Sequence, residues 1–285
     1  MSSAENSLRN TLVFFIITYV FSWIFWVPQV LNSMGIIADS VFTEFLSSPF
    51  NIAAFGPLVA AILLVVKENG LKGIKNLLKK GIMVDFAKKW VLPMFLLYPA
   101  IFLVSMLVGI PFGFSPDLEI LAHPEVITIG FFVILLTAGP LQEEFGWRGY
   151  AVPKLQEQYN AIVTSFIVGV AWALWHFPLF FLPSPGDGSA FYYDQPVWIM
   201  VISVIFSSIL FTWIYNNTKG SVFATLMLHT SLNWILWVFL PLQSFEVAFS
   251  STIIIVLIAV AISIYYGPNL DNSPSQKQDE SIAKG

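Results

Sequence analysis

The sequence is organised around long apolar segments that contain no Asp, Glu, Lys or Arg. Most of them exceed the roughly 20 residues that an α-helix needs to cross a bilayer, and the fourth lies at the short end of the range. The alternating pattern of a membrane β-barrel is absent. The pattern therefore predicts an all-α, polytopic membrane protein with eight transmembrane helices. The eight segments are residues 10–38, 45–66, 90–116, 126–142, 158–186, 195–218, 220–245 and 247–270.

The composition supports the same class of protein. Hydrophobic residues make up 57% of the chain and charged residues 11%, whereas soluble domains contain about 25% charged residues. We expect one membrane domain over residues 1–266, arranged around an intramembrane cavity, and a polar, disordered tail over residues 267–285. The absence of cysteine excludes disulfides, thiolate metal sites and cysteine nucleophiles. Nothing in the sequence suggests a nucleic-acid partner.

The distribution of basic residues predicts the orientation in the membrane. Lys and Arg accumulate in the cytoplasmic loops of membrane proteins. With a cytoplasmic N-terminus, eight spans place all 13 basic residues on the cytoplasmic side and return the C-terminus to that side. The opposite loops then carry acidic residues and no Lys or Arg. These acidic residues are Asp39, Glu44, Asp117, Glu119, Glu125, Asp187, Asp194 and Glu246.

Basic residues are concentrated after the second apolar segment, where seven of the 13 lie between Lys67 and Lys89. Apolar residues recur there at helical spacing, among them Leu71, Ile74 and Leu78. This pattern is typical of an amphipathic interfacial segment that touches anionic membrane lipids. A positive-inside anchor with no further role explains the same residues.

Two adjacent carboxylates, Glu143 and Glu144, stand at the end of the fourth apolar segment. Ionisable groups at membrane depth are costly unless they are paired or functional. Neighbouring helical residues point about 100° apart, so the two side chains have different tasks. Arg148, four residues after Glu144, is in the favourable position for an ion pair. Glu143 is left without a local partner and is a candidate general base.

A structural alternative is that both glutamates cap the cytosolic end of the fourth helix near bulk water. Carboxylates at a helix C-terminus interact unfavourably with the helix dipole. Capping alone would therefore not explain why two glutamates stand there. Pro140 precedes the glutamates, and proline can kink or interrupt a helix that borders a cavity.

Further polar residues lie inside the fifth and seventh segments. Trp172 precedes His176 by four residues, and Asn233 follows His229 by four, so each pair shares one face of its helix. Either histidine alone could hydrogen-bond a neighbouring helix. Two histidines together with two carboxylates favour a functional site, and Pro178 is expected to end or kink the fifth helix just after His176.

The depths of the two histidines do not match in this scheme. Counted from Ala161, His176 lies about 22 Å along its helix, whereas His229 lies about 12 Å from Ser221. The difference can be absorbed if the fifth helix starts nearer Lys154, or if it tilts strongly.

The three motifs, Glu143-Glu144-x-x-x-Arg148, Trp172-x-x-x-His176 and His229-x-x-x-Asn233, occur in this order. They resemble those of the CAAX prenyl endopeptidase family, also called CPBP or Abi proteins, a group of intramembrane proteases. Trp172 departs from the pattern, since many members carry Phe there. The motif-bearing core covers residues 126–245, and the eight-helix topology extends the resemblance over the chain.

The resemblance implies hydrolysis of a peptide bond near the C-terminus of a lipid-modified protein, in a cavity reached from the cytosol and the membrane. The membrane is the plasma membrane if the source is prokaryotic and the endoplasmic reticulum if it is eukaryotic. Glu143, helped by His176, would then deprotonate a water molecule. His229 and Asn233 would donate hydrogen bonds to the oxyanion, with Glu144, Arg148 and Trp172 as supporting residues.

A metal-dependent mechanism is the alternative. Glu143, His176 and His229 could bind one divalent ion, zinc above all, with water as the fourth ligand. No His-Glu-x-x-His motif is present, and using Glu143 as a ligand leaves only Glu144 as the base. We therefore prefer a mechanism without a cofactor.

Other function classes also fit buried glutamate and histidine. A proton-coupled transporter would show pH-dependent flux and no proteolysis. A non-catalytic membrane protein of the bacteriocin-immunity type would show neither activity. The complete set of three motifs favours the protease over both.

Overall fold

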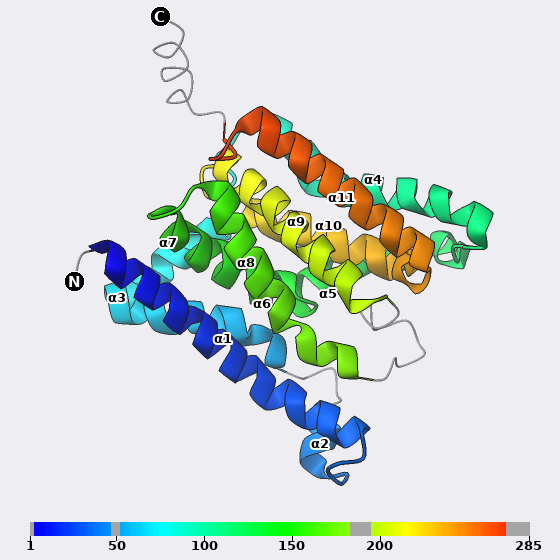
Figure 1. Ribbon diagram of the computed structural model, residues 1–285, viewed down its shortest axis with the longest axis horizontal. Coiled ribbons are helices and arrows are strands. Elements are labelled where there is room, and N and C mark those ends of the chain that lie inside the picture. Colours follow the sequence, from blue (N-terminus) through cyan, green and yellow to red (C-terminus); the bar gives the residue numbers. More distant parts are fainter. Residues whose placement is uncertain (1–2, 47–51, 183–194, 272–285) are drawn as a thin grey trace, which may run out of the picture.

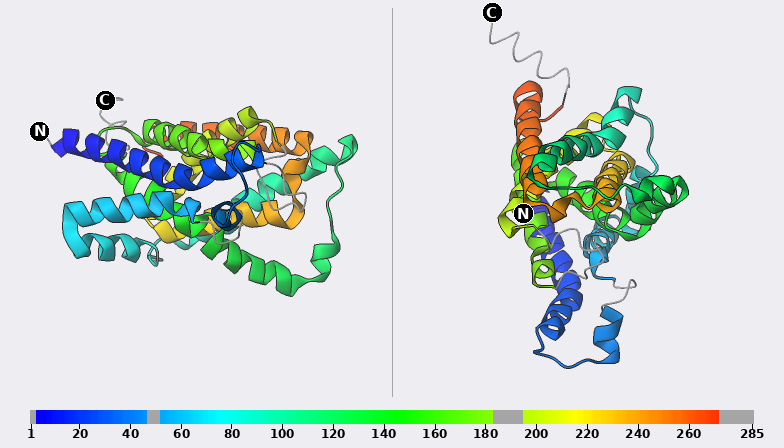
Figure 2. Two further views of the ribbon diagram at one scale, coloured as in Figure 1. Left: turned by 90° about the horizontal axis from the view of Figure 1, so that it is seen from below. Right: turned by 90° about the vertical axis from the view of Figure 1, so that its right-hand side faces the viewer.

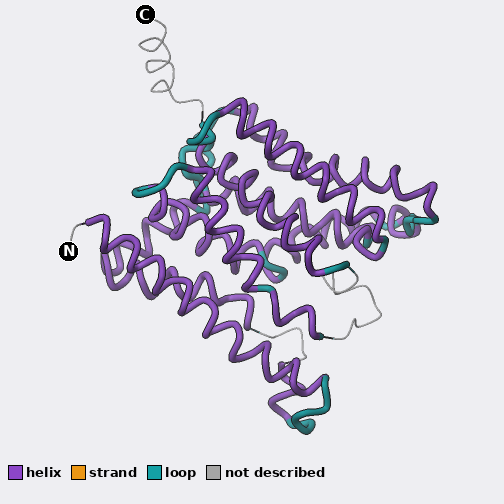
Figure 3. The backbone as a smooth tube through the Cα atoms, viewed as in Figure 1, coloured by secondary structure: helices purple, strands orange, loops and turns teal. Residues whose placement is uncertain are grey.

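The computed structural model describes residues 3–46, 52–182 and 195–271, and every regular element in these ranges is a helix (Figures 1 and 3). The predicted all-α class is confirmed. Asp187 and Asp194 of a predicted loop, and the predicted tail from residue 272 onward, lie outside the described residues.

Each longer helix overlaps an apolar segment, although α3 begins after the start of its segment and continues through the charged residues that follow it. The α-helices are α1 (Ser3–Ser33), α2 (Val41–Leu46), α3 (Gly56–Lys80), α4 (Val91–Gly109), α5 (Pro124–Thr137), α6 (Pro140–Gly146), α7 (Val152–Gln156), α8 (Ala161–Trp175), α9 (Val197–Asn217), α10 (Val222–Phe239) and α11 (Phe245–Tyr266). The short 3₁₀ segments are η1 (Ala53–Phe55), η2 (Lys88–Trp90), η3 (Ile110–Phe112), η4 (Glu119–Ala122), η6 (Phe177–Phe181) and η7 (Pro241–Gln243). A π-helical turn, η5 (Trp147–Ala151), connects α6 to α7.

Within the described residues, seven helices are long and apolar enough to cross a membrane. The pair Pro124–Thr137 and Pro140–Gln156, bent by 41° at a short break, gives an eighth if it is counted as one span. The described residues thus hold seven or eight candidate spans, a range that includes the predicted eight. The side of the membrane on which the termini lie stays a prediction.

The break has a local cause in Gly139-Pro140. Gly139 adopts a φ of 107°, which glycine reaches without the steric cost that a side chain brings. Pro140 is the first residue of α6, where its missing N–H is not needed and its fixed φ suits a helix start. The interruption at Pro140 agrees with the sequence, which did not predict that Pro140 starts a new helix.

Helix α10 forms the centre of the bundle. Of its residues in the membrane-spanning window 72% are buried, compared with 28% in α1. Helix α10 packs against α4, α5, α6 and α9. Helix α1 lies at one edge of the bundle and packs mainly on α3 (Figure 1). Helix α5 runs along the outside of the bundle (Figure 2, left), and Ile134 is its single buried residue.

Candidate active site

The two glutamates begin a helix instead of ending one. Glu143 lies in the first turn of α6, and Glu144 follows it, because the Gly139-Pro140 break starts a new helix before them. The expectation that they stand at a helix C-terminus was wrong. Carboxylates are stabilised near a helix N-terminus, where the backbone dipole is positive. The local structure thus favours the negative charge that the sequence placed at membrane depth.

Glu143 is buried, with 4% of its surface exposed. Its Oε2 atom accepts a hydrogen bond of 2.5 Å from the indole Nε1 of Trp172 on α8. Its Oε1 atom faces Gly139, since a β-carbon added to that glycine would lie 2.8 Å from the oxygen. One carboxylate oxygen is therefore held by the protein, and the other points toward the backbone break.

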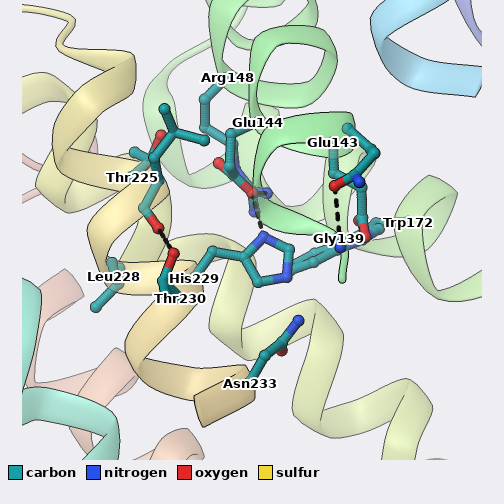
Figure 4. A network of polar contacts seen from close by, with 12 residues as sticks. Gly139, Glu143, Glu144, Arg148, Trp172, Thr225, Leu228, His229, Thr230 and Asn233 are labelled. Atoms are coloured by element: carbon teal, nitrogen blue, oxygen red, sulfur yellow. Dashed lines mark hydrogen bonds and ion pairs between the residues drawn. The ribbon is translucent and has the colours of Figure 1, made fainter. Parts of the chain in front are cut away.

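Three polar groups surround the space beside Gly139 (Figure 4). The position of the absent β-carbon lies 2.8 Å from Glu143 Oε1 and 3.2 Å from Asn233 Nδ2. It lies 3.6 Å from His229 Nε2. An acceptor from α6 and two nitrogen atoms from α10 thus lie close to one point, which a side chain at residue 139 would occupy.

Glu144 makes the predicted ion pair with Arg148, at 2.8 Å between side chains that are both 0% exposed. The same oxygen, Oε1, lies 2.9 Å from Nδ1 of His229, a contact that the sequence did not predict. A carboxylate only accepts, so Nδ1 is the donor in this contact. Glu144 therefore orients the His229 ring so that Nε2 is directed at the point beside Gly139.

The guanidinium group of Arg148 is enclosed by two aromatic rings. Its central carbon lies 4.4 Å from the ring centroid of Trp172 and 4.2 Å from that of Phe211. Stacking of this kind stabilises a desolvated cation in addition to the ion pair. Arg148 therefore supports the site by fixing Glu144.

His176 caps the C-terminal end of α8, and Pro178 lies in the following η6 segment. The fifth helix thus ends where the sequence indicated. Its start at Ala161 excludes an extension toward Lys154. The Nδ1 atom of His176 lies 2.9 Å from the backbone oxygen of Trp172.

Trp172 packs against both histidines. The ring of Trp172, one turn before His176, packs at 5.5 Å from the ring of His229. The ring of His176 lies 6.0 Å from Trp172. Trp172 therefore links Glu143, through its side chain, to His176, through its backbone.

Two residues that shape the break, Gly139 and Gln142, were not among the predicted site residues. Gly139 N–H donates to Gln142 Oε1 at 3.1 Å, and Gln142 Nε2 donates to the backbone oxygen of Leu136 at 3.0 Å. Asn233 Nδ2 donates to the backbone oxygen of Ala138 at 2.7 Å. A glutamine three residues after a Gly-Pro start is a capping signal that could have identified Gln142.

A three-ligand metal set is not formed by the described part of the chain, where no three His, Asp or Glu side chains are placed to hold one ion. The zinc alternative requires Glu143, His176 and His229 to converge. Nδ1 of His229 contacts Glu144, which leaves Nε2 for any ligand.

The fold and the site together define a multi-pass membrane protein with a buried glutamate, histidine and asparagine around one point. Comparison with known proteins gives the class. Residues 125–235, which include all three motifs, match the model of a family described as Type II CAAX prenyl endopeptidase Rce1-like. Over 232 residues the chain is 26% identical to CAAX prenyl protease 2 of Methanococcus maripaludis, covering 79% of this chain and 83% of that protein.

These matches confirm the resemblance found in the motifs. The protein is an intramembrane peptidase, a hydrolase similar to the CAAX prenyl proteases.

Proposed function

We propose that the protein cleaves a peptide bond near the C-terminus of a lipid-modified membrane protein, of the CAAX-type prenylated class, with water as the nucleophile. The observation that supports this proposal is the convergence of Glu143 Oε1, His229 Nε2 and Asn233 Nδ2 on one point beside Gly139. Peptide hydrolysis needs a base beside the attacking water and donors beside the developing oxyanion. The site offers both within a few ångströms.

In the proposed reaction, Glu143 Oε1 accepts a proton from a water molecule, and His176 assists. The water oxygen attacks the carbonyl carbon of the substrate, and the carbonyl oxygen becomes an oxyanion. Asn233 and His229 donate hydrogen bonds to this oxyanion. When the C–N bond breaks, the proton held by Glu143 passes to the leaving amine.

This role sets the protonation of His229. Its Nδ1 proton is used in the contact with Glu144, so donation from Nε2 requires protons on both ring nitrogens. Glu144 lies directly beside that ring, and the two carboxylates of Glu143 and Glu144 together balance the charges of Arg148 and a doubly protonated His229. Glu144 thus supports the oxyanion donor, while Glu143 works on the water.

The substrate reaches the site from the cytosolic side in this proposal. All 13 basic residues fall on one side of the predicted topology, the side that is cytoplasmic in membrane proteins. The partners are a lipid-modified protein or peptide and the membrane lipids. The lipid chain of the substrate would keep the reacting peptide bond close to the membrane.

The test is cleavage of a prenylated C-terminal peptide by the purified protein, with the cleaved bond identified by mass spectrometry. Glu143→Gln removes the base and is expected to lower kcat by about 100- to 10,000-fold. Glu125→Gln is the matched control, because Glu125 lies on the same broken span with its side chain 63% exposed. A fully active Glu143→Gln protein would exclude this mechanism. pH-dependent ion flux without cleavage would favour a transporter.

A second experiment separates the two forms of the mechanism. We expect activity to persist after exhaustive chelation, with no zinc found by elemental analysis. Loss of cleavage on chelation, followed by recovery on adding zinc, would instead assign Glu143 and the histidines as ligands.

A further inference from the structure

Trp172 contacts several residues of the candidate site, and no specific function has been assigned to it above. Its indole N–H donates to Glu143 Oε2, its ring covers the guanidinium of Arg148, and its ring edge packs against His229. Its backbone oxygen lies 2.9 Å from Nδ1 of His176. The side chain is 2% exposed, so its position is fixed by packing.

The geometry points to a specific function of the indole N–H. We propose that Trp172 is a positioning residue for hydrolysis, which holds Glu143 by Oε2 so that Oε1 faces the point beside Gly139. This inference rests on the proposed function and adds to it. A free glutamate side chain has three rotatable bonds and a carboxylate that turns easily. A single strong donor to one oxygen removes that freedom and defines which oxygen meets water.

Other contacts of the carboxylate show why one donor is sufficient. Oε1 lies against Gly139, 2.8 Å from where the β-carbon of any other residue would stand. The neighbouring charge of Arg148 is paired with Glu144 and does not hold Glu143. Hydrogen bonds to charged groups are among the stronger ones in proteins, and their loss is measurable.

Trp172→Phe separates the two properties of this side chain. Phenylalanine keeps an aromatic ring beside Arg148 and His229 but has no N–H to donate. If Trp172 positions Glu143, kcat for the prenylated peptide falls by about 10- to 100-fold, while KM changes less than about twofold. The thermal unfolding midpoint stays close to that of the wild type.

Trp175→Phe is the matched control. Trp175 lies on the same helix, is 1% exposed, and donates its indole N–H to Ser22 Oγ at 2.7 Å. This variant loses an equivalent buried hydrogen bond that does not involve Glu143. We expect it to lower the unfolding midpoint and to keep kcat within about threefold of the wild type.

A double variant distinguishes positioning from general structural damage. In a Glu143→Gln background there is no base to position, so adding Trp172→Phe should cause no further loss of the residual rate. A wild-type kcat in Trp172→Phe, or a full additional loss in the double variant, would overturn the inference. An active Glu143→Gln protein would instead reject the proposed base.

One measurement needs no substrate. In protein labelled with ¹⁵N-tryptophan, the indole resonance of Trp172 is the one that disappears in Trp172→Phe. Glu143→Gln should shift this resonance and leave that of Trp175 in place, because Trp172 donates to Glu143 whereas Trp175 donates to Ser22. An unchanged Trp172 resonance would contradict the contact on which the inference depends.

Discussion

Helix α5 and the helical run Pro140–Gln156 follow each other across the break at Gly139, yet their surroundings are opposite. In α5 the apolar side chains Ile129 and Phe132 are 61% and 58% exposed, as expected of a lipid-facing helix. Beyond the break, every residue from Gln142 to Val152 is buried. The difference shows that the break at Gly139 separates a helix that meets lipid from a helix that carries buried charge.

The largest effect is expected from the buried ion pair of the inner half. Arg148→Met removes the guanidinium from the buried Glu144 and leaves that carboxylate its contact with His229, which should destabilise the fold by about 3–5 kcal/mol. Lys154→Met, farther along the same run, removes a pair with Glu68 in which the lysine is 27% exposed, and should cost less than about 1 kcal/mol. Reversible unfolding in mixed micelles measures both. Equal losses would show that burial does not distinguish the two pairs.

Two neighbouring residues of α10 donate hydrogen bonds to the break and to α5. Asn233 donates to Ala138 at the break, and Trp234 donates to the backbone oxygen of Ile127 in α5, at 2.9 Å. Asn233→Ala removes an oxyanion donor and should lower kcat by about 100- to 1,000-fold. Trp234→Phe should retain most activity. Similar kinetics for the two variants would contradict the role of Asn233.

The break itself can be tested with two glycines of positive φ. Gly139→Ala places a β-carbon 2.8 Å from Glu143 Oε1 and should lower kcat/KM by about 10- to 100-fold. Gly113 has a φ of 97° and no neighbour within 4 Å of an added β-carbon. Gly113→Ala also puts an alanine at a positive φ, in the left-handed region, at a cost of about 1–2 kcal/mol and without touching the site. If both variants lose activity alike, backbone strain and not the space beside Gly139 is responsible.

The smallest effect is expected on the outer half. Ile129→Ala shortens a side chain that faces lipid and should change stability by less than about 0.5 kcal/mol. Its kcat/KM should stay within twofold of the wild type in the peptide assay. A loss as large as that of Gly139→Ala would mean that α5 contributes directly to the site.

Much of the fold could be predicted because hydrophobic length is set by the bilayer. Charge-free segments located the spans, and the four-residue spacing placed His229 and Asn233 on one face of α10. Proline marked the ends of α5 and α8 correctly. Local chemistry within one helix was also readable, as the pair of Glu144 with Arg148 shows.

Contacts between helices could not be predicted in the same way. The hydrogen bond from Trp172 to Glu143 and the contact between Glu144 and His229 depend on how α6, α8 and α10 pack together. Glu143 lies near the negative end of a helix dipole if Pro140 only kinks one helix, and near the positive end if Pro140 starts a new helix. The positive φ of Gly139 decided that question, and a single sequence does not contain this torsion angle.

The most direct test of the site is a structure of the protein with a non-cleavable phosphinic peptide, whose tetrahedral phosphorus imitates the reaction intermediate. We predict one phosphinyl oxygen within hydrogen-bond reach, about 2.6–3.2 Å, of His229 Nε2 and Asn233 Nδ2. The other oxygen should lie beside Glu143 Oε1. Both oxygens bound to a metal ion, or a phosphinate remote from Gly139, would contradict the proposed mechanism.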